Sequence, residues 1–184
     1  MDIIVIVFII FLILLILSVA VIAILLFWSD LTTRAPFVPI PKAVLPAIVE
    51  ALAITPESEV WDLGCGDGRV LLAMQAKIPK AKYIGADKDI IPYWLAKFRT
   101  RKIKGIEIKR QNFLRSDLSN ATHIFAYLFP VVLSALLPKL RQELKPGARL
   151  VSCDFIFTQK EPVKVINLNR PKGKLGRFLY VYEF

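Results

Sequence analysis

The sequence predicts an α/β protein in which a doubly wound, mostly parallel sheet of seven strands follows one transmembrane helix. Strand-like and helix-like segments alternate after residue 55, which predicts a parallel sheet with helices on both faces. Two consecutive strand-like segments close the chain and predict an antiparallel edge. A long apolar run at the start predicts the membrane helix. We therefore divide the chain into an anchor (residues 1–28), a proline-rich connector with a short helix (residues 29–54) and the α/β domain (residues 55–184).

The anchor is predicted from the run Ile3 to Trp28, which contains no charged residue, glycine or proline. About 20 apolar residues span the hydrocarbon core of a bilayer, so this run is long enough to cross it with some tilt. A cleaved signal peptide fits less well, because no basic segment precedes the run and the run exceeds the roughly 7–15 apolar residues of such peptides. We expect a retained, single-pass helix.

The charge distribution predicts the orientation of this helix. All 25 Lys and Arg residues follow it, as does every acidic residue except Asp2. Lys and Arg stay on the cytoplasmic side of a membrane helix, so we expect a cytosolic domain. The membrane would be the inner membrane of a prokaryote or a mitochondrial membrane of a eukaryote. A tethered domain this basic favours contact with anionic lipid headgroups, and we do not expect nucleic acid as a partner.

The connector and the elements of the domain follow from local patterns. The segment from Ser29 to Pro41 contains three prolines and should be extended. Apolar periodicity then predicts helices at Lys42–Ile54, Arg69–Lys77, Ile90–Arg101 and Val131–Leu144. The seven strands are predicted at Glu59–Leu63, Lys82–Asp87, Ile106–Arg110, His123–Tyr127, Ala148–Phe155, Val163–Leu168 and Phe178–Phe184.

A glycine-rich motif lies where the first predicted strand gives way to a helix. It begins at Asp62 and continues through Gly64, Cys65, Gly66 and Gly68. Doubly wound sheets bind ligands outside the carboxyl ends of their strands, and glycines allow the backbone to approach a ligand closely. The spacing Asp-x-Gly-x-Gly-x-Gly differs from the dinucleotide fingerprint Gly-x-Gly-x-x-Gly. A carboxylate at this loop would repel a pyrophosphate, but it suits a sulfonium cofactor that has a free amino group.

Two further polar residues lie at or just after the carboxyl ends of the next two strands. Asp87 ends the second strand, where a carboxylate accepts hydrogen bonds from both ribose hydroxyls of a nucleoside. Asn112 follows the third strand, where its amide is placed to bond an adenine edge. Cys65 is expected to fill space inside the glycine loop.

With these residues in this order, residues 36–184 resemble the class I S-adenosylmethionine (SAM)-dependent methyltransferases. The resemblance implies a Rossmann-like fold with SAM as its cofactor. It also implies that the glycine loop wraps the methionine part of SAM, that Asp62 supports the amino group of SAM and that Asp87 holds its ribose.

A closer resemblance is to the small, helix-anchored lysine methyltransferases that modify the ATP synthase c-subunit and the adenine nucleotide translocase. It is carried by residues 35–39, 62–71 and 148–157 and by the position of the anchor. This resemblance implies a protein-lysine N-methyltransferase that acts on a membrane protein.

The acceptor site is predicted around the ends of the fourth and fifth strands. The segment after the fourth strand lacks the Asn/Asp-Pro-Pro-aromatic loop typical of enzymes that methylate planar nitrogens, which argues against adenine or glutamine. Tyr127 and Phe129 are candidates to line a channel for a lysine side chain. Asp154 is a candidate to accept a proton from the amine or to orient it.

The sequence leaves other interpretations open. A lipid-like or quinone-like small molecule would also justify an anchor, and a non-enzymatic module that binds RNA or a protein partner remains an alternative. Cys153 is expected to be a buried thiol and His123 a structural residue. No cluster of His and Cys has the spacing of a metal site, so no metal is expected.

Overall fold

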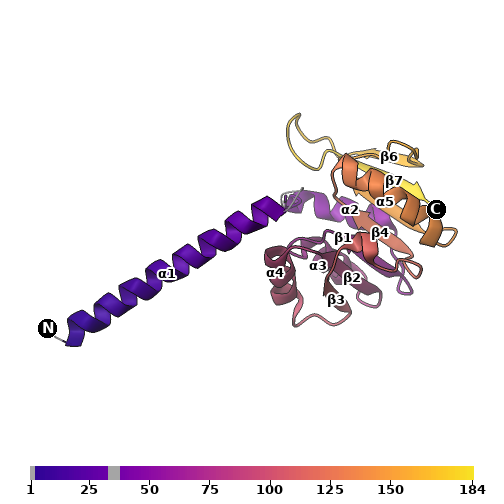
Figure 1. The fold of residues 1–184 in the computed structure, drawn as a ribbon. Helices are drawn as coiled ribbons and strands as arrows, with labels where there is room; N and C mark the ends of the chain where they lie inside the picture. Colours follow the sequence, from indigo (N-terminus) through magenta and orange to yellow (C-terminus); the bar gives the residue numbers. More distant parts are fainter. Residues whose placement is uncertain (1–2, 33–37) are drawn as a thin grey trace. The chain divides into compact units, whose positions relative to one another are not determined.

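The computed structural model describes residues 3–32 and 38–184 (Figure 1). The chain divides into two compact units, residues 1–36 and 37–184. The first contains α1 (Ile3–Thr32), of which Ile3–Leu26 is long and apolar enough to cross a membrane, with a mean hydropathy of 3.7.

The start of the predicted connector is helical, which corrects the sequence-based expectation. We expected extended chain from Ser29 onwards, but α1 continues to Thr32. The reason is that extending an existing helix is far easier than starting one, and no proline or glycine interrupts residues 29–32. The part of the connector at residues 33–37 lies outside the described residues.

Seven strands of the second unit form one sheet in the order β3-β2-β1-β4-β5-β7-β6. Strands β1 to β5 run parallel, and β7 is antiparallel to both of its neighbours, β5 and β6. This arrangement confirms the predicted α/β class. The strands are β1 (Glu59–Leu63), β2 (Lys82–Asp87), β3 (Ile106–Arg110), β4 (His123–Ala126), β5 (Arg149–Cys153), β6 (Lys164–Asn167) and β7 (Phe178–Glu183).

Helices cover both faces of this sheet (Figure 1). One apolar cluster contains buried residues of α2 (Leu45–Leu52), α3 (Arg69–Lys77) and α4 (Ile90–Thr100). The other contains the buried face of α5 (Pro130–Glu143). Two short 3₁₀ turns, η1 (Lys42–Val44) and η2 (Phe113–Arg115), complete the elements.

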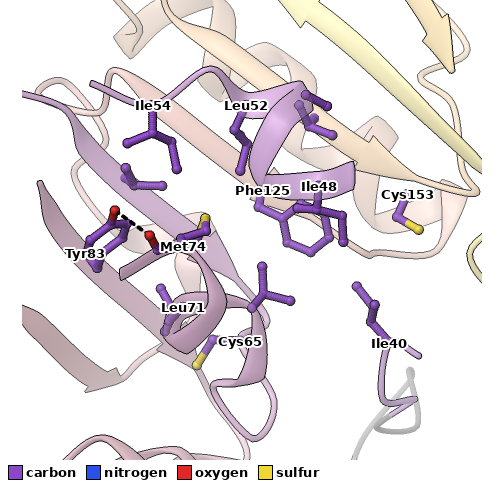
Figure 2. Close-up of a cluster of buried hydrophobic side chains, with 14 of the residues drawn as sticks. Ile40, Ile48, Leu52, Ile54, Cys65, Leu71, Met74, Tyr83, Phe125 and Cys153 are labelled. Carbon is purple, nitrogen blue, oxygen red and sulfur yellow. Dashed lines mark hydrogen bonds between the residues drawn. The ribbon is translucent and has the colours of Figure 1, made fainter. Parts of the chain in front are cut away.

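The first cluster joins α2 and α3 to the sheet (Figure 2). Ile48 and Leu52 of α2 and Leu71 of α3 are fully buried. Full burial of each such large apolar side chain contributes about 1.5–3 kcal/mol to the free energy of unfolding. The hydroxyl of Tyr83 is also buried but donates to the carbonyl oxygen of Met74 over 3.1 Å, so this polar group has a partner.

Two predicted elements end differently for local reasons. The predicted helix Lys42–Ile54 is divided into η1 and α2, and it ends where Ala53 adopts a left-handed φ of 54°. The fifth strand, predicted to reach Phe155, ends at Cys153 because Asp154 has a φ of 60°. A left-handed residue cannot continue a strand. The remaining predicted bounds agree to within a residue or two.

Candidate active site

The glycine loop lies at the carboxyl end of β1, in the middle of the sheet. The backbone N–H groups of Gly64 and Cys65 both donate to the carbonyl oxygen of Ala86 in β2, over 2.8 and 3.2 Å. Gly64, Gly66 and Gly68 have φ values of 76°, 57° and 74°. Any other residue would be strained there, so the backbone geometry explains why all three positions are glycine.

Gly68 is also a point of close packing. A Cβ atom at this position would lie 3.3 Å from the Cβ of Ala96 in α4. The loop and α4 therefore approach each other across two of the smallest residues.

Asp87 connects the end of β2 to the glycine loop. The N–H of Gly66 donates to Oδ2 of Asp87 over 3.0 Å, and the N–H of Asp89 donates to Oδ1 over 3.0 Å. The Asp87 side chain is buried, and burial raises the pKa of its carboxyl. The two predicted parts of the site are thus joined directly.

Asp62 is buried beneath the same loop. Its Oδ2 atom is buried and has no hydrogen-bond partner among the described residues. Burial, followed by repulsion from Asp87 and Asp67, raises the pKa of the Asp62 carboxyl well above its ordinary value. Buried polar atoms are nearly always paired in folded proteins. An orphaned carboxylate at a loop of this kind therefore suits a ligand that brings a positive charge or an N–H donor.

Asn112 lies at the same edge of the sheet, after β3. The neighbouring N–H of Gln111 donates to the carbonyl oxygen of Asp87 over 3.0 Å. The Oδ1 atom of Asn112 accepts from the N–H of Leu114 over 3.0 Å and so caps η2. Its amide oxygen is thus engaged within the chain, and its proposed contact with an adenine rests on the amide nitrogen.

An ion-pair network centred on a buried carboxylate of the loop was not predicted from the sequence. The side chain of Asp67 is only 3% exposed and pairs with the guanidinium groups of Arg69 and Arg99. Burial alone would raise the pKa of Asp67, but hydrogen bonds and charge from Arg69, together with the charge of Arg99, hold it below its ordinary value. Arg69 also donates to the carbonyl oxygen of Ile40 over 2.8 Å. The network thus joins the glycine loop to α4 and to the segment before α2. The signal for it was the acid inside the motif, two residues before an arginine.

Three aromatic rings gather at the ends of β4 and β5. Tyr127 stacks on Phe155 with ring centroids 5.8 Å apart, and Phe129 lies 5.5 Å from the same ring. Tyr127 and Phe129 were predicted from the sequence but Phe155 was not, and it joins them because β4 and β5 are neighbours. Burial raises the pKa of Tyr127 to about 12, so its hydroxyl stays protonated at neutral pH.

Asp154 has a set of partners that its sequence did not reveal. Its carboxylate accepts from the backbone N–H groups of Gly176, Arg177 and Phe178 over 2.6, 2.6 and 3.1 Å. These three residues lead into β7. The carboxylate therefore connects the end of β5 to the start of β7, and its role as a proton acceptor stays a prediction.

The remaining singled-out side chains are buried or peripheral. Both thiols are buried and free, and burial raises the pKa of Cys65 and of Cys153. A thiol of this kind is a weak nucleophile. His123 lies at the opposite end of β4, where its Nδ1 is 2.9 Å from the hydroxyl of Thr122. No group of three His, Cys, Asp or Glu side chains in residues 3–32 and 38–184 could hold a metal ion.

Known proteins resemble this chain in sequence and in fold. A model of the ANTKMT methyltransferase domain matches residues 62–164. A protein-lysine N-methyltransferase of Saccharolobus islandicus (strain REY15A) is 33% identical over 152 residues, which make up 81% of this chain and 93% of that protein. The lysine N-methyltransferase of the ATP synthase c-subunit from Rattus norvegicus is 27% identical, over 69% of this chain and 59% of that protein.

A solved structure has the same architecture. The crystal structure of an RNA methyltransferase from Salinibacter ruber in complex with S-adenosyl-L-homocysteine superposes with a TM-score of 0.73 at 27% identity. The match covers 79% of this chain and 93% of that one.

Proposed function

Because this chain belongs to the ANTKMT methyltransferase family, and is therefore a SAM-dependent methyltransferase, we propose that it methylates a lysine of a membrane-associated protein. The choice of acceptor rests on the 33% identity to a protein-lysine N-methyltransferase, in an alignment that covers 93% of that protein. The two relatives named above both carry lysine methylation in their names, and one of them concerns a component of ATP synthase.

The residues at the glycine loop fit SAM. When bound, SAM supplies a methyl group activated by its sulfonium. The orphaned Oδ2 of Asp62 would accept from the amino group of SAM, and Asp87 would hold the ribose hydroxyls. The turns at Gly64, Gly66 and Gly68 would let the backbone lie against the cofactor, with Cys65 filling the interior of the loop.

The aromatic cluster of Tyr127, Phe129 and Phe155 would form the acceptor site. A lysine ammonium that enters an apolar site loses hydration, which lowers its pKa and favours the neutral amine. The neutral nitrogen would attack the methyl carbon as the carbon–sulfur bond breaks, and the rings would exclude water and align the amine. Asp154 would act indirectly, by holding the chain segment beside this cluster.

The helix α1 would keep the domain at the membrane surface. Its apolar stretch Ile3–Leu26 is long enough to span a bilayer, and the chain after it is strongly basic. A single-pass anchor with the domain on the cytosolic side agrees with this charge distribution. Tethering raises the local concentration of a membrane-embedded substrate. We propose residues 1–28, 29–54 and 55–184 as anchor, connector and methyltransferase domain.

The test is methyl transfer from isotope-labelled SAM to native membrane fractions, followed by mass spectrometry of proteins, lipids and RNA. We expect labelled lysine in a membrane protein, and loss of that label when residues 1–28 are deleted although SAM binding persists. Labelled lipid without labelled protein would favour a small-molecule acceptor. Labelled RNA would favour the activity named for the Salinibacter ruber enzyme. Unchanged labelling after the deletion would refute the role of the anchor.

The same assay tests the aromatic cluster. Phe155→Ala removes the ring that contacts both Tyr127 and Phe129, so lysine labelling should fall strongly while SAM affinity is retained. Phe155→Leu, which keeps an apolar side chain but no ring, is the matched variant. Equal labelling by wild type and Phe155→Ala would place the acceptor elsewhere.

A further inference from the structure

The helix α4 carries its large apolar side chains on the outside. Ile91, Trp94, Leu95 and Phe98 have the spacing of one helical stripe, and all are exposed, with Trp94 at 59% and Phe98 at 64%. A surface helix normally turns such a stripe towards the core.

The buried side of α4 carries small residues instead. Pro92, Ala96 and Thr100 face the domain, and Ala96 lies against Gly68 of the glycine loop. The large apolar stripe lies on nearly the opposite side of the helix, so it contributes little to the core that holds α4 in place. An exposed apolar patch of this kind marks a contact with a membrane or with another protein.

Two basic side chains lie beside this stripe, and α4 itself contains no acidic residue. Between Ile90 and Ile106 the sequence has five basic residues and no acidic residue. Lys97 lies 5.9 Å from the ring of Trp94, and the guanidinium of Arg101 lies 3.7 Å from the ring of Phe98. Apolar rings with long cationic side chains beside them match the boundary between acyl chains and anionic headgroups, where such side chains bury their stems and leave their charges in water.

The tether makes a lipid surface available at short range. Seven residues separate Thr32, the end of α1, from Ile40, which is buried in the domain. At about 3.5 Å per residue they reach roughly 25–30 Å when fully extended. If α1 spans a membrane, this tether keeps the domain near the membrane surface, so that the apolar stripe can meet lipid as the domain rotates.

We propose that α4 is a second membrane contact, which docks on anionic lipid through Ile91, Trp94, Leu95 and Phe98 with Lys97 and Arg101 at its rim. The proposal rests on the membrane attachment proposed above. Docking of α4 would restrict the rotation of the tethered domain, because two points of contact define an orientation that one does not. It would thereby fix which side of the methyltransferase faces the bilayer and its embedded substrate.

Fluorescence of the full chain in lipid vesicles tests this proposal. The chain has three tryptophans, so a Trp28→Phe background leaves Trp94 and the buried Trp61. The protein is reconstituted in vesicles of equal parts phosphatidylcholine and phosphatidylglycerol with brominated acyl chains. We expect the brominated lipid to quench Trp94, and the residual emission of Trp28→Phe/Trp94→Phe to be unquenched.

Charge variants test the role of the rim. Each Lys or Arg near an anionic surface contributes about a fivefold factor, so Lys97→Glu/Arg101→Glu should lower the ratio of docked to undocked domain at least roughly 30-fold. Lys77→Glu/Lys80→Glu makes the same change in net charge as the α4 variant, but at the end of α3 and just after it, and it should leave quenching unchanged. Vesicles of phosphatidylcholine alone should show weaker quenching of Trp94. Calorimetric SAM binding checks that every variant is folded.

Two outcomes overturn the α4 contact and the membrane attachment separately. Protein that floats with the vesicles but shows no quenching of Trp94 refutes the α4 contact and leaves the anchor intact. If such protein instead shields Trp94 from an aqueous quencher only when a membrane-protein substrate is added, the stripe binds protein rather than lipid. Protein that fails to float with the vesicles refutes the membrane attachment itself.

Discussion

Replacing Asp154 separates a structural role from a catalytic one. The carboxylate accepts three backbone N–H groups at 2.6, 2.6 and 3.1 Å. At about 1 kcal/mol net for each hydrogen bond, Asp154→Ala loses roughly 3 kcal/mol. The φ of 60° adds about 1 kcal/mol, because alanine tolerates the left-handed region less well than aspartate. We expect the free energy of unfolding to fall by roughly 4 kcal/mol.

Asp154→Asn is the matched variant for the same position. Asparagine tolerates a positive φ and keeps one acceptor oxygen, but it places an amide NH₂ where the second oxygen was. We expect it to lower the free energy of unfolding by about 1–2 kcal/mol.

Thermal unfolding of the full chain in nanodiscs, followed by Trp fluorescence, measures both effects. For a domain of this size 1 kcal/mol corresponds to about 2–4 °C, so Tm should fall by roughly 8–16 °C for Asp154→Ala and by roughly 2–8 °C for Asp154→Asn. The pH dependence of methyl transfer by Asp154→Asn should keep its wild-type shape. A structural role for Asp154 is refuted if Asp154→Asn leaves Tm within about 1 °C of wild type and removes one limb of the pH profile, since that is the behaviour of a general base.

Four further variants test the cofactor site and the packing beneath it. Asp62→Asn removes a buried carboxylate whose pKa is raised by burial, so Tm of the cofactor-free protein should rise at neutral pH while SAM binds more weakly. Because the folded-state pKa of Asp62 is raised, the wild type gains stability as pH falls from that pKa towards the unfolded value near 3.8. The difference in Tm between Asp62→Asn and wild type should therefore shrink on acidification, and a difference that stays constant contradicts this. Asp87→Asn should weaken SAM binding by roughly 10–100-fold in calorimetry, and wild-type affinity would remove Asp87 from the site. Gly85→Ala places a Cβ 2.6 Å from Leu71 and should lower the free energy of unfolding in denaturant by about 1–3 kcal/mol. Gly147 has open space around it, so Gly147→Ala should lower that free energy by only about 1 kcal/mol, through backbone strain.

Features governed by local pattern were predicted well. The bounds of β1, α3, β2 and β3 agree with the sequence-based expectation, because apolar runs bounded by glycine, proline and polar residues determine them. The glycine motif was recognisable because its backbone conformation requires glycine at three fixed positions.

Two element ends and the contacts between distant residues were not predicted. The continuation of α1 beyond Ser29 and the early end of β5 have local causes, namely helix extension and a single left-handed residue, which the apolar pattern does not indicate. The pairing of Asp67 with Arg99 spans 32 residues and could not be read from spacing. Phe155 joined the aromatic cluster only because β4 and β5 lie side by side.

The sequence by itself determined the α/β class and the apolar stretch that suits a membrane, through periodicity and composition, and its short motifs carry the resemblance that implied the family and the cofactor. The tertiary structure alone decided what individual side chains do. It engaged Asp154 with three N–H donors, left Asp62 without a partner among the described residues and turned the apolar stripe of α4 outwards. The physical reason is that burial and hydrogen bonding depend on which segments meet in space, and a one-dimensional pattern carries little information about those encounters.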